Sequence, residues 1–292
     1  MSLAELTETV QAAGHAGVPR APAFIVTLYG DAIEPRGGTL WMGDLVTCCA
    51  QQGISESLVR TAVSRLVAAG KLLGERIGRK SYYRLTEPAQ AEFKEAARVL
   101  YAPPPQARGW LIAPVAEEPL PDGWALMGQR TAIAPNRDDI TRLPGPLLSA
   151  ETIQDPEGWP KLAADLWELD SVAERYLRFL SRFKSLASLL GAGAGQLDVS
   201  GDQALALRLQ LVHHYRLAAL RDPRLPREAL PARWPGVEAR RLFVTAYLAL
   251  ADAADAYVGR TFRDSDGLLL SSTETTGLRL DRLAREASLI SR

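Results

Sequence analysis

The sequence is poor in the side chains on which many enzymes and metal sites depend. Its 292 residues include three histidines and only two cysteines, Cys48 and Cys49, which are adjacent. A disulfide between neighbouring residues has poor geometry and two thiols leave a zinc site incomplete, so both are expected to be small core residues. We find no nucleophile elbow, Walker loop, zinc-ligand spacing or dinucleotide fingerprint. We therefore predict no catalytic residue, no metal and no cofactor, and a protein that is not an enzyme.

Long apolar runs and excess charge are also missing. No apolar run reaches the roughly 18 residues of a membrane-spanning helix, and the first ten residues lack the features of a signal peptide. We therefore expect a cytoplasmic protein with no membrane partner. Basic and acidic residues both number 34, which argues against a nonspecific nucleic-acid coat. Hydrophobic residues make up 47%, so most of the chain should fold, and its length suggests two or three domains.

One stretch departs from this neutral background. Residues 53–85 (GISESLVRTAVSRLVAAGKLLGERIGRKSYYRL) predict a helix, a turn and a basic hairpin. The hydroxyl of Ser55 is expected to cap the start of the helix, and Gly70 to end it. A buried apolar stripe is predicted from helical spacing, made of Leu58, Val59, Ala62, Val63, Leu66 and Val67. The opposite face carries Ser57, Arg60, Thr61, Ser64 and Arg65.

The hairpin is expected to turn at Gly78, with Tyr82 and Tyr83 on its second strand. Residues 54–84 contain seven basic and two acidic residues, a local excess of five positive charges. A helix with hydroxyls and arginines on its free face, followed by a basic hairpin, is typical of a winged helix-turn-helix. In that motif the helix enters the major groove and the hairpin lies on the phosphate backbone.

This motif assigns separate roles to the two parts of the stretch. The candidates for contacts to base edges are Ser57, Arg60, Thr61 and Ser64. The candidates for contacts to phosphates are Arg65, Lys71, Arg76, Arg79, Lys80, Tyr82 and Arg84. Of the two tyrosines, one should pack on the helix and the other reach a phosphate. The plain alternative is a solvated helix face in a helical protein-interaction adaptor, which would not need Arg79 and Lys80 at a hairpin tip.

Prolines and glycines divide the chain into three predicted domains. The first, residues 20–101, is the winged helix-turn-helix, with further helices over 23–33, 41–51 and 87–101 and a turn at 35–38. Residues 101–109 (YAPPPQARG) contain three consecutive prolines, which cannot continue a helix. Residues 1–22 are expected to form a mobile arm or a poorly fixed helix.

The second predicted domain, residues 108–190, is small and α+β. It should contain strands near 110–115, 124–134 and 147–153, followed by a long helix over 161–190. The Gly-rich stretch 191–201 is expected to be a flexible join. The third domain, residues 200–292, is predicted to be helical, with helices over 202–221, 239–257 and 276–289. The proline-rich connection at 222–236 should pack against them, and the fold class as a whole is α+β and mostly helical.

A few residues in the third domain are candidates for a small-molecule site. His214 could line a pocket, although the side chains of neighbouring helical residues diverge, so that at most one of His213 and His214 points inward. Arg216 and Arg221 could hold phosphates, because a guanidinium matches phosphate geometry. Trp234 could wall an aryl group. The ordinary alternatives are exposed or ion-paired arginines and a core tryptophan.

Three long stretches of the chain stand out together: FIVTLYGDAIEPRGGTLWMGDLV, LVRTAVSRLVAAGKLLGERIGRKSYYRLTEPA and HHYRLAALRDPRLPREALPARWPG. In this order they resemble the PaaX-like regulators, repressors of phenylacetate-degradation operons. The resemblance implies a winged helix, a ferredoxin-like middle domain and a C-terminal domain, acting as a homodimer. It also implies double-stranded operator DNA as partner and release by an aryl-CoA thioester such as phenylacetyl-CoA. The alternative is a winged-helix regulator of another pathway with a different effector.

The chain departs from the family pattern in the middle domain. Only residues 116–123 (AEEPLPDG) separate the first two expected strands, where similar sequences carry a helix. Eight residues with two prolines cannot hold that helix. The ferredoxin-like βαββαβ pattern is therefore expected to lack its first helix.

Overall fold

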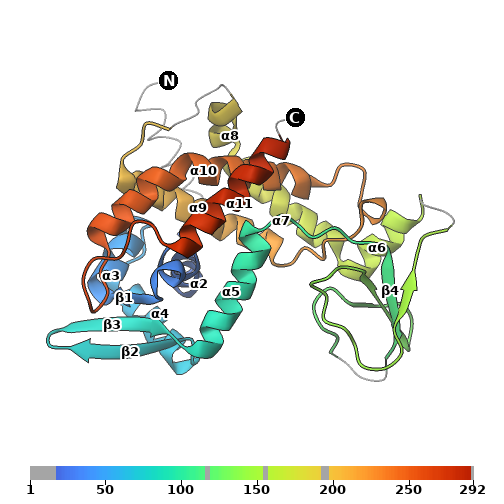
Figure 1. Ribbon diagram of the computed structural model, residues 1–292, viewed down its shortest axis with the longest axis horizontal. Coiled ribbons are helices and arrows are strands. Elements are labelled where there is room, and N and C mark those ends of the chain that lie inside the picture. Colours follow the sequence, from blue (N-terminus) through green and yellow to red (C-terminus); the bar gives the residue numbers. More distant parts are fainter. Residues whose placement is uncertain (1–17, 116–118, 154–156, 192–196, 291–292) are drawn as a thin grey trace.

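The computed structural model describes residues 18–115, 119–153, 157–191 and 197–290. The fold is α+β and mostly helical, with a three-stranded and a four-stranded antiparallel sheet in the described ranges. Figure 1 shows a basic hairpin at the lower left, the four-stranded sheet on the right, and long helices across the top. Most of the predicted mobile arm, residues 1–17, and the centre of the predicted flexible join, residues 192–196, lie outside the described residues.

The first segment follows the predicted order of elements. Its elements are α2 (Ala21–Leu28), the π-helical turn η1 (Tyr29–Ile33), the 3-10 turn η2 (Glu34–Arg36), β1 (Thr39–Trp41), α3 (Met42–Ala50), α4 (Glu56–Ala68), β2 (Leu72–Ile77), β3 (Lys80–Leu85) and α5 (Glu87–Tyr101). The turn at 35–38 forms because Gly37 and Gly38 adopt positive φ angles of 97° and 76°. Strand β1 pairs with β3, so β3 is the central strand of the small sheet.

The middle segment is a four-stranded sheet. Its strands are β4 (Trp110–Pro114), β5 (Ala125–Leu126), β6 (Thr131–Pro135) and β7 (Leu148–Ala150), in the order β5-β6-β4-β7. The single strand predicted over 124–134 is wrong, because Gly128 turns the chain with a φ of 87° and separates β5 from β6. Residues 119–124 and 136–147 form no helix. Within the described residues, neither crossover of the expected βαββαβ pattern therefore carries one.

The long helix predicted over 161–190 is three helices: α6 (Trp159–Trp167), α7 (Leu169–Arg182) and α8 (Lys184–Gly191). The first break is at Glu168, which has a left-handed φ of 49°. The last segment contains α9 (Gly201–Ala219), the 3-10 turn η3 (Arg227–Ala229), α10 (Pro235–Thr261) and α11 (Glu274–Ile290). The proline-rich connection is buried, but mainly against other neighbours than predicted, since Leu225 and Ala229 cluster with Trp110 of β4 and η3 contacts α6.

The first and last segments share one hydrophobic core. Phe24 and Leu28 of α2 belong to the same cluster of buried residues as Phe243 and Tyr247 of α10. Helix α7 also joins this cluster, packing against α9 and α10. Two smaller clusters involve the four-stranded sheet, one around Trp124 and one around Trp110, and the second also includes residues of α6, α7 and the proline-rich connection. The domain boundaries at 101–108 and 190–200 remain predictions.

Two predictions were based on features that the sequence has little of, cysteine and long apolar runs. Cys48 and Cys49 are buried in the core, and burial raises the pKa of the Cys49 thiol to about 12, as expected of unreactive packing residues. Helix α10 is long and apolar enough to cross a membrane, although charged residues interrupt its apolar stretches. Half of its most apolar window is buried in this fold, where α10 packs against α9, α7 and α11.

Candidate nucleic-acid interface

Helix α4 is seated by a narrow apolar stripe. Val59, Ala62 and Val63 are buried, and the helix packs on α2 and α3. The prediction that Leu58 and Val67 join this stripe is wrong, because their exposed fractions are 54% and 37%. Besides α2 and α3, the helix contacts strand β2 of the hairpin, and the residues outside the stripe are mostly exposed. Most of its circumference is therefore free for a partner.

The two ends of α4 are fixed differently. Ser55 has the extended conformation of an N-cap, but its hydroxyl makes no cap bond and lies 3.2 Å from the hydroxyl of Ser57. The predicted capping hydrogen bond is therefore absent. At the other end Gly70 has a φ of 67°. Its N–H donates to the carbonyl of Val67 and the N–H of Lys71 donates to that of Leu66, which is a Schellman motif.

The four base-edge candidates, Ser57, Arg60, Thr61 and Ser64, are all exposed on α4. Arg60 pairs with Glu56 one turn earlier, with 2.7 Å between Nη2 and Oε1 and both side chains more than half exposed. An exposed pair of this kind is weak, so Arg60 is available to a base. The hydroxyl of Thr61 donates to the carbonyl of Ser57, which leaves its oxygen free to accept.

The hairpin presents most of the phosphate candidates. Strands β2 and β3 are joined by the two residues Gly78 and Arg79, and Gly78 has the positive φ, 61°, that such tight turns require. Arg79 is exposed beside it, and Lys80 lies with its Nζ 5.1 Å from the ring centre of Trp41. Exposed side chains on α4 and the hairpin add further positive charge, from Arg65, Arg76 and Arg84.

Two phosphate candidates are less available than the sequence suggested. Tyr82 is only 7% exposed and lies opposite Trp41 of β1, so little of its side chain is available to a phosphate. Tyr83, the next residue, faces a groove of about 490 Å³ between α4 and the hairpin, together with Arg60, Ser64 and Arg76. Lys71 is half-buried and pairs with Glu92 of α5 at 2.5 Å.

The last segment of the chain holds the base of the hairpin. The N–H of Trp41 donates to the carbonyl of Arg263, which follows α10. The guanidinium of Arg263 lies 4.8 Å from the Trp41 ring and 3.0 Å from the carboxylate of Asp44. Arg36, at the turn before β1, donates to the carbonyls of Leu270 and Ser271. We call α4 and the β2–β3 hairpin the reading surface. Strand β1, which pairs with β3 of this surface, is therefore fixed directly to the loop between α10 and α11.

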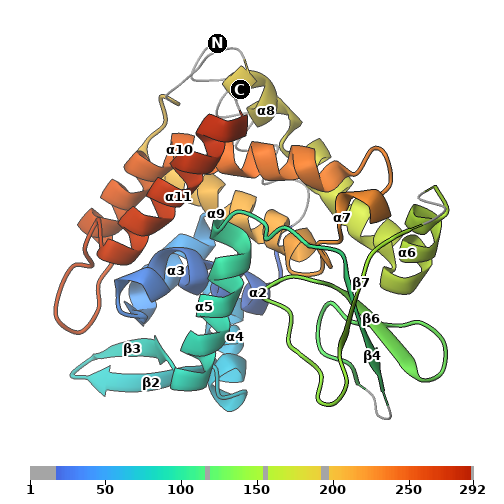
Figure 2. The same cartoon turned by 45° about the vertical axis from the view of Figure 1, so that its right-hand side comes forward.

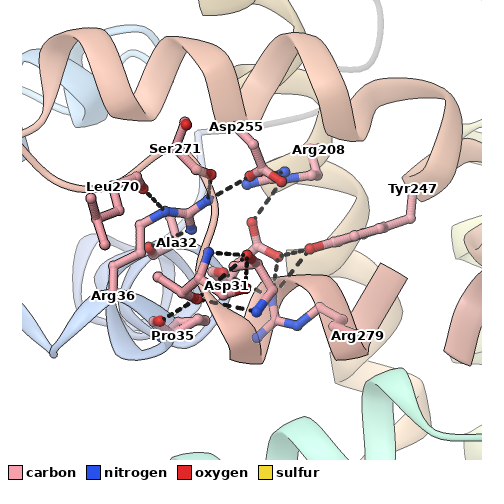
Figure 3. Close-up of polar contacts among 12 residues, drawn as sticks. Asp31, Ala32, Pro35, Arg36, Arg208, Tyr247, Asp255, Leu270, Ser271 and Arg279 are labelled. Atoms are coloured by element: carbon pink, nitrogen blue, oxygen red, sulfur yellow. Dashed lines mark hydrogen bonds and ion pairs between the residues drawn. The ribbon is translucent and has the colours of Figure 1, made fainter. Parts of the chain in front are cut away.

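A buried network of charges joins the same two segments (Figure 3). Asp31 of η1 accepts hydrogen bonds from Arg208 of α9 at 2.9 Å and from the hydroxyls of Tyr101 and Tyr247. Arg208 also pairs with Asp255 of α10 at 2.7 Å. Burial opposes ionisation of Asp31, but Arg208 and Arg279 outweigh it and hold the pKa of Asp31 below its usual value.

The sequence did not single out this network, although a signal for it was present. Asp31 is the one charge in the apolar stretch AFIVTLYGDAI, and Arg208 is the one charge in ALALRLQLV. A lone charge inside a buried helix requires a partner. Arg36 completes the network by binding Asp255 at 2.9 Å. These residues link α9, α10 and α11 to η1 and η2 of the first segment.

The four effector candidates do not come together. His214 is partly buried next to His213, and burial lowers the pKa of these histidines to about 3 and about 4, so both are neutral. Arg216 donates to the carbonyl of Ala23 and to Thr27, which ties α9 to α2. Trp234 packs on Tyr176, with 6.0 Å between their ring centres. Of the four, Arg216 and Arg221 line one cleft.

Comparison with known proteins places these features in a family. Residues 20–89 match the family described as PaaX-like protein, and residues 167–260 match its C-terminal domain. The chain is 30% identical to the protein named transcriptional repressor PaaX of Escherichia coli, over 91% of this chain and 92% of the relative. The relative is a repressor and not an enzyme, in agreement with the motifs that the sequence lacks.

A solved structure is also similar in part. The uncharacterized protein Rv0674 from Mycobacterium tuberculosis has 22% identity and a TM-score of 0.43, over 73% of this chain and 89% of that one. This similarity is too low to add to the assignment. The residues matched by the two family descriptions include α4, the hairpin and, in the buried network, Arg208 and Asp255. The identity over nearly the whole length shows that the chain belongs to the PaaX-like family of transcriptional regulators.

Proposed function

We propose that the protein is a DNA-binding transcriptional repressor of an aromatic-acid operon of the phenylacetate type, and that residues 20–101 form its winged helix-turn-helix. One observation carries the proposal. Arg60 and Ser64 of α4 line one groove with Arg76 of the cationic hairpin, and the other two hydroxyls, Ser57 and Thr61, are exposed on the same helix. In this arrangement α4 enters the major groove of the operator and the hairpin follows the phosphate backbone.

The two parts contribute differently to binding. Arg60 can donate two hydrogen bonds to a guanine, which discriminates against a wrong base by about 1–3 kcal/mol. Arg79 and Lys80 at the hairpin tip neutralise phosphates, which adds affinity that is independent of sequence and falls as salt rises. Because the whole chain has a formal net charge of zero, this affinity is confined to one face of the molecule.

We further propose that the protein is a cytoplasmic homodimer. A two-fold dimer presents two copies of α4, and these match an imperfect palindrome with half-sites about one helical turn apart. Residues 108–190 are proposed as a middle domain with a ferredoxin-like sheet whose described crossovers carry no helix, and residues 200–292 as the helical C-terminal domain. Release from the operator is assigned to a small-molecule effector, an aryl-CoA thioester such as phenylacetyl-CoA.

The decisive experiment is a gel shift on the promoter beside the protein's own gene. We expect a sequence-specific complex whose affinity falls as salt rises, and its dissociation when phenylacetyl-CoA is added. A protein that shows no such complex is not this repressor. Dissociation by a different small molecule, with none by thioesters, would assign the protein to another pathway.

A further inference from the structure

A small apolar pocket lies where the first segment of the chain packs against α9. Its volume is about 150 Å³, and it is bounded by α2, η1, α5 and α9. Its apolar lining comes from Val26, Phe93, Ala97, Leu100 and Val212. An apolar cavity of about this volume is enough to hold one benzene ring. The pocket is therefore of the right size and chemistry for a single aryl group.

A much wider cleft opens beside this pocket. It has a volume of about 1080 Å³ and is bounded by α5, loops of the four-stranded sheet, α7 and the end of α9. Figure 2 shows α5 between the hairpin on one side and the four-stranded sheet on the other. The cleft is far larger than a ring needs, and arginines and carboxylates from these elements line it. The carboxylates are Glu95, Asp122, Asp139, Glu168 and Asp222.

Several arginines line the cleft, but they are not equivalent. Arg98 and Arg137 are paired with Glu95 and Asp139. Arg175 of α7 has no carboxylate partner in the described residues, and its Nε is buried without an acceptor. Arg221, at the end of α9, is exposed and likewise unpaired among the described residues. A buried donor without an acceptor is costly, so Arg175 points to an anionic ligand.

The pocket and the cleft share part of their walls. Ala96 of α5 and Arg216 of α9 line both of them. Arg216 donates hydrogen bonds to Ala23 and Thr27 of α2, so its side chain is held in place between the pocket and the cleft. A ligand with a ring at one end and a long charged group at the other can run alongside Arg216 and occupy the pocket and the cleft together.

We propose that this junction is the effector site, and that it takes a ligand whose ring-sized apolar group is joined to a multiply charged phosphate-bearing group, as in an aryl thioester of coenzyme A. The assignment rests on the proposed function of the protein as a repressor. The ring lies between α2, η1 and α5, and the phosphates bind Arg175 and Arg221 in the cleft.

The position of the pocket explains how the ligand acts on DNA binding. Asp31 lines it, and Asp31 is the carboxylate on which the buried charge network converges. Helix α2, another wall, carries α4 on its surface. A ring in the pocket favours the arrangement of α2 and α9 that closes on it, and α4, which packs on α2, shifts with that arrangement. In a dimer bound to two half-sites, such a shift misaligns the two reading helices.

Two variants separate the two halves of the site. Ala97→Leu fills the ring pocket with a helix-forming side chain. Arg175→Ala with Arg221→Ala removes the unpaired cations of the cleft and leaves the core intact. Arg178→Ala is the matched control, because Arg178 is an exposed arginine on the same helix α7 that does not line the cleft. Operator affinity without ligand should be unchanged in all three.

The measurement is release of a labelled operator by phenylacetyl-CoA, together with calorimetry of phenylacetyl-CoA, coenzyme A and phenylacetate. For Ala97→Leu and for the double arginine variant we expect the half-release concentration to rise about tenfold, the loss of one good contact. The arginine variant should also lose binding of coenzyme A alone, which Ala97→Leu should keep. Arg178→Ala should match the unmodified protein.

The outcomes separate the site from the proposed function. If the unmodified protein binds phenylacetyl-CoA but no operator, the repressor function fails, and the calorimetry of the variants still tests the site. If it is released from the operator by phenylacetyl-CoA and both variants respond like Arg178→Ala, the assignment of the site is overturned. If calorimetry shows no binding of phenylacetyl-CoA or coenzyme A to the unmodified protein, the assigned ligand class is wrong.

Discussion

Arginines at the junction of the first and last segments are buried and paired, whereas those on α4 and the hairpin are exposed and mostly unpaired. Arg208 is fully buried and binds both Asp31 and Asp255. Arg65 and Arg79 are exposed and have no ion-pair partner among the described residues. The same side chain therefore serves two purposes. At the junction it fixes how two segments sit together, and on the surface it is kept free for phosphates.

The largest expected effect comes from breaking the junction. Arg208→Gln leaves Asp31 and Asp255 without their shared cation in a buried site, and this should destabilise the protein by about 3–5 kcal/mol. Arg65→Gln, an exposed change, should stay within about 0.5 kcal/mol. Urea unfolding followed by circular dichroism measures both.

A double variant tests whether the uncompensated charge is the cause. Asp31→Asn with Arg208→Gln should be less destabilised than the sum of the two single changes, because the buried carboxylate is gone. Equal stabilities of the Arg208 and Arg65 variants would show that the two groups of arginines do not differ as described.

The next effect is a pH dependence at the same junction, from buried His213 and partly buried His214, neither of which has a carboxylate partner in the part of the chain that the structure describes. Burial lowers the pKa of His213 to about 4 and of His214 to about 3, whereas both titrate near 6.5 when unfolded. Between these values the unfolded chain binds more protons, so stability is present above pH 6.5 and falls as the pH drops. At pH 5 each histidine should cost about 1–2 kcal/mol.

Melting temperatures measured from pH 7.5 to pH 5 test this sign. His213→Gln with His214→Gln should flatten the decline in that range. Asp31 does not contribute there, because its pKa lies below the usual 3.8 and its stabilisation is lost only at more acidic pH. A decline that persists unchanged in the double variant would assign the pH dependence to other groups.

The reading surface was predictable from sequence because its signals are local. Gly70 ends α4, Gly78 sets a two-residue turn, and the alternation along β3 orients its side chains. Local spacing did not reveal which tyrosine is buried, because Tyr82 lies opposite Trp41 of β1, more than forty residues earlier in the chain. The hairpin could be located from sequence, but its two faces could not be told apart.

The junction and the candidate effector site were not predictable in the same way. Asp31 and Arg208 each stand out as a charge in an apolar run, but 177 residues separate them, and only the packing of α9 on α2 brings them together. Packing against α7 and its C-cap explains why Trp234 and His214 are poor effector candidates. Their residue types suit a ligand, but their side chains face neighbours in the core.

A smaller effect tests the division of labour within the reading surface. Arg60→Ala should reduce discrimination between the operator and altered operators by about 1–3 kcal/mol, because a base contact is lost. Arg79→Ala should weaken binding to all sequences alike and lower the slope of log affinity against log salt by about one. Gel shifts at several salt concentrations measure both. If the two variants lose specificity equally, the separation between helix and hairpin is wrong.

The smallest expected effect compares two helix starts on this surface. The hydroxyl of Thr86 accepts from the N–H of Ala89 and donates to the carbonyl of Gly70, so Thr86→Ala should cost about 1 kcal/mol. Ser55 makes no cap bond, and Ser55→Ala should cost about 0.3 kcal/mol or less. Urea unfolding of both variants gives the difference. Equal costs would mean that Ser55 does cap α4 in solution, which would fix its hydroxyl and withdraw it from the face that meets DNA.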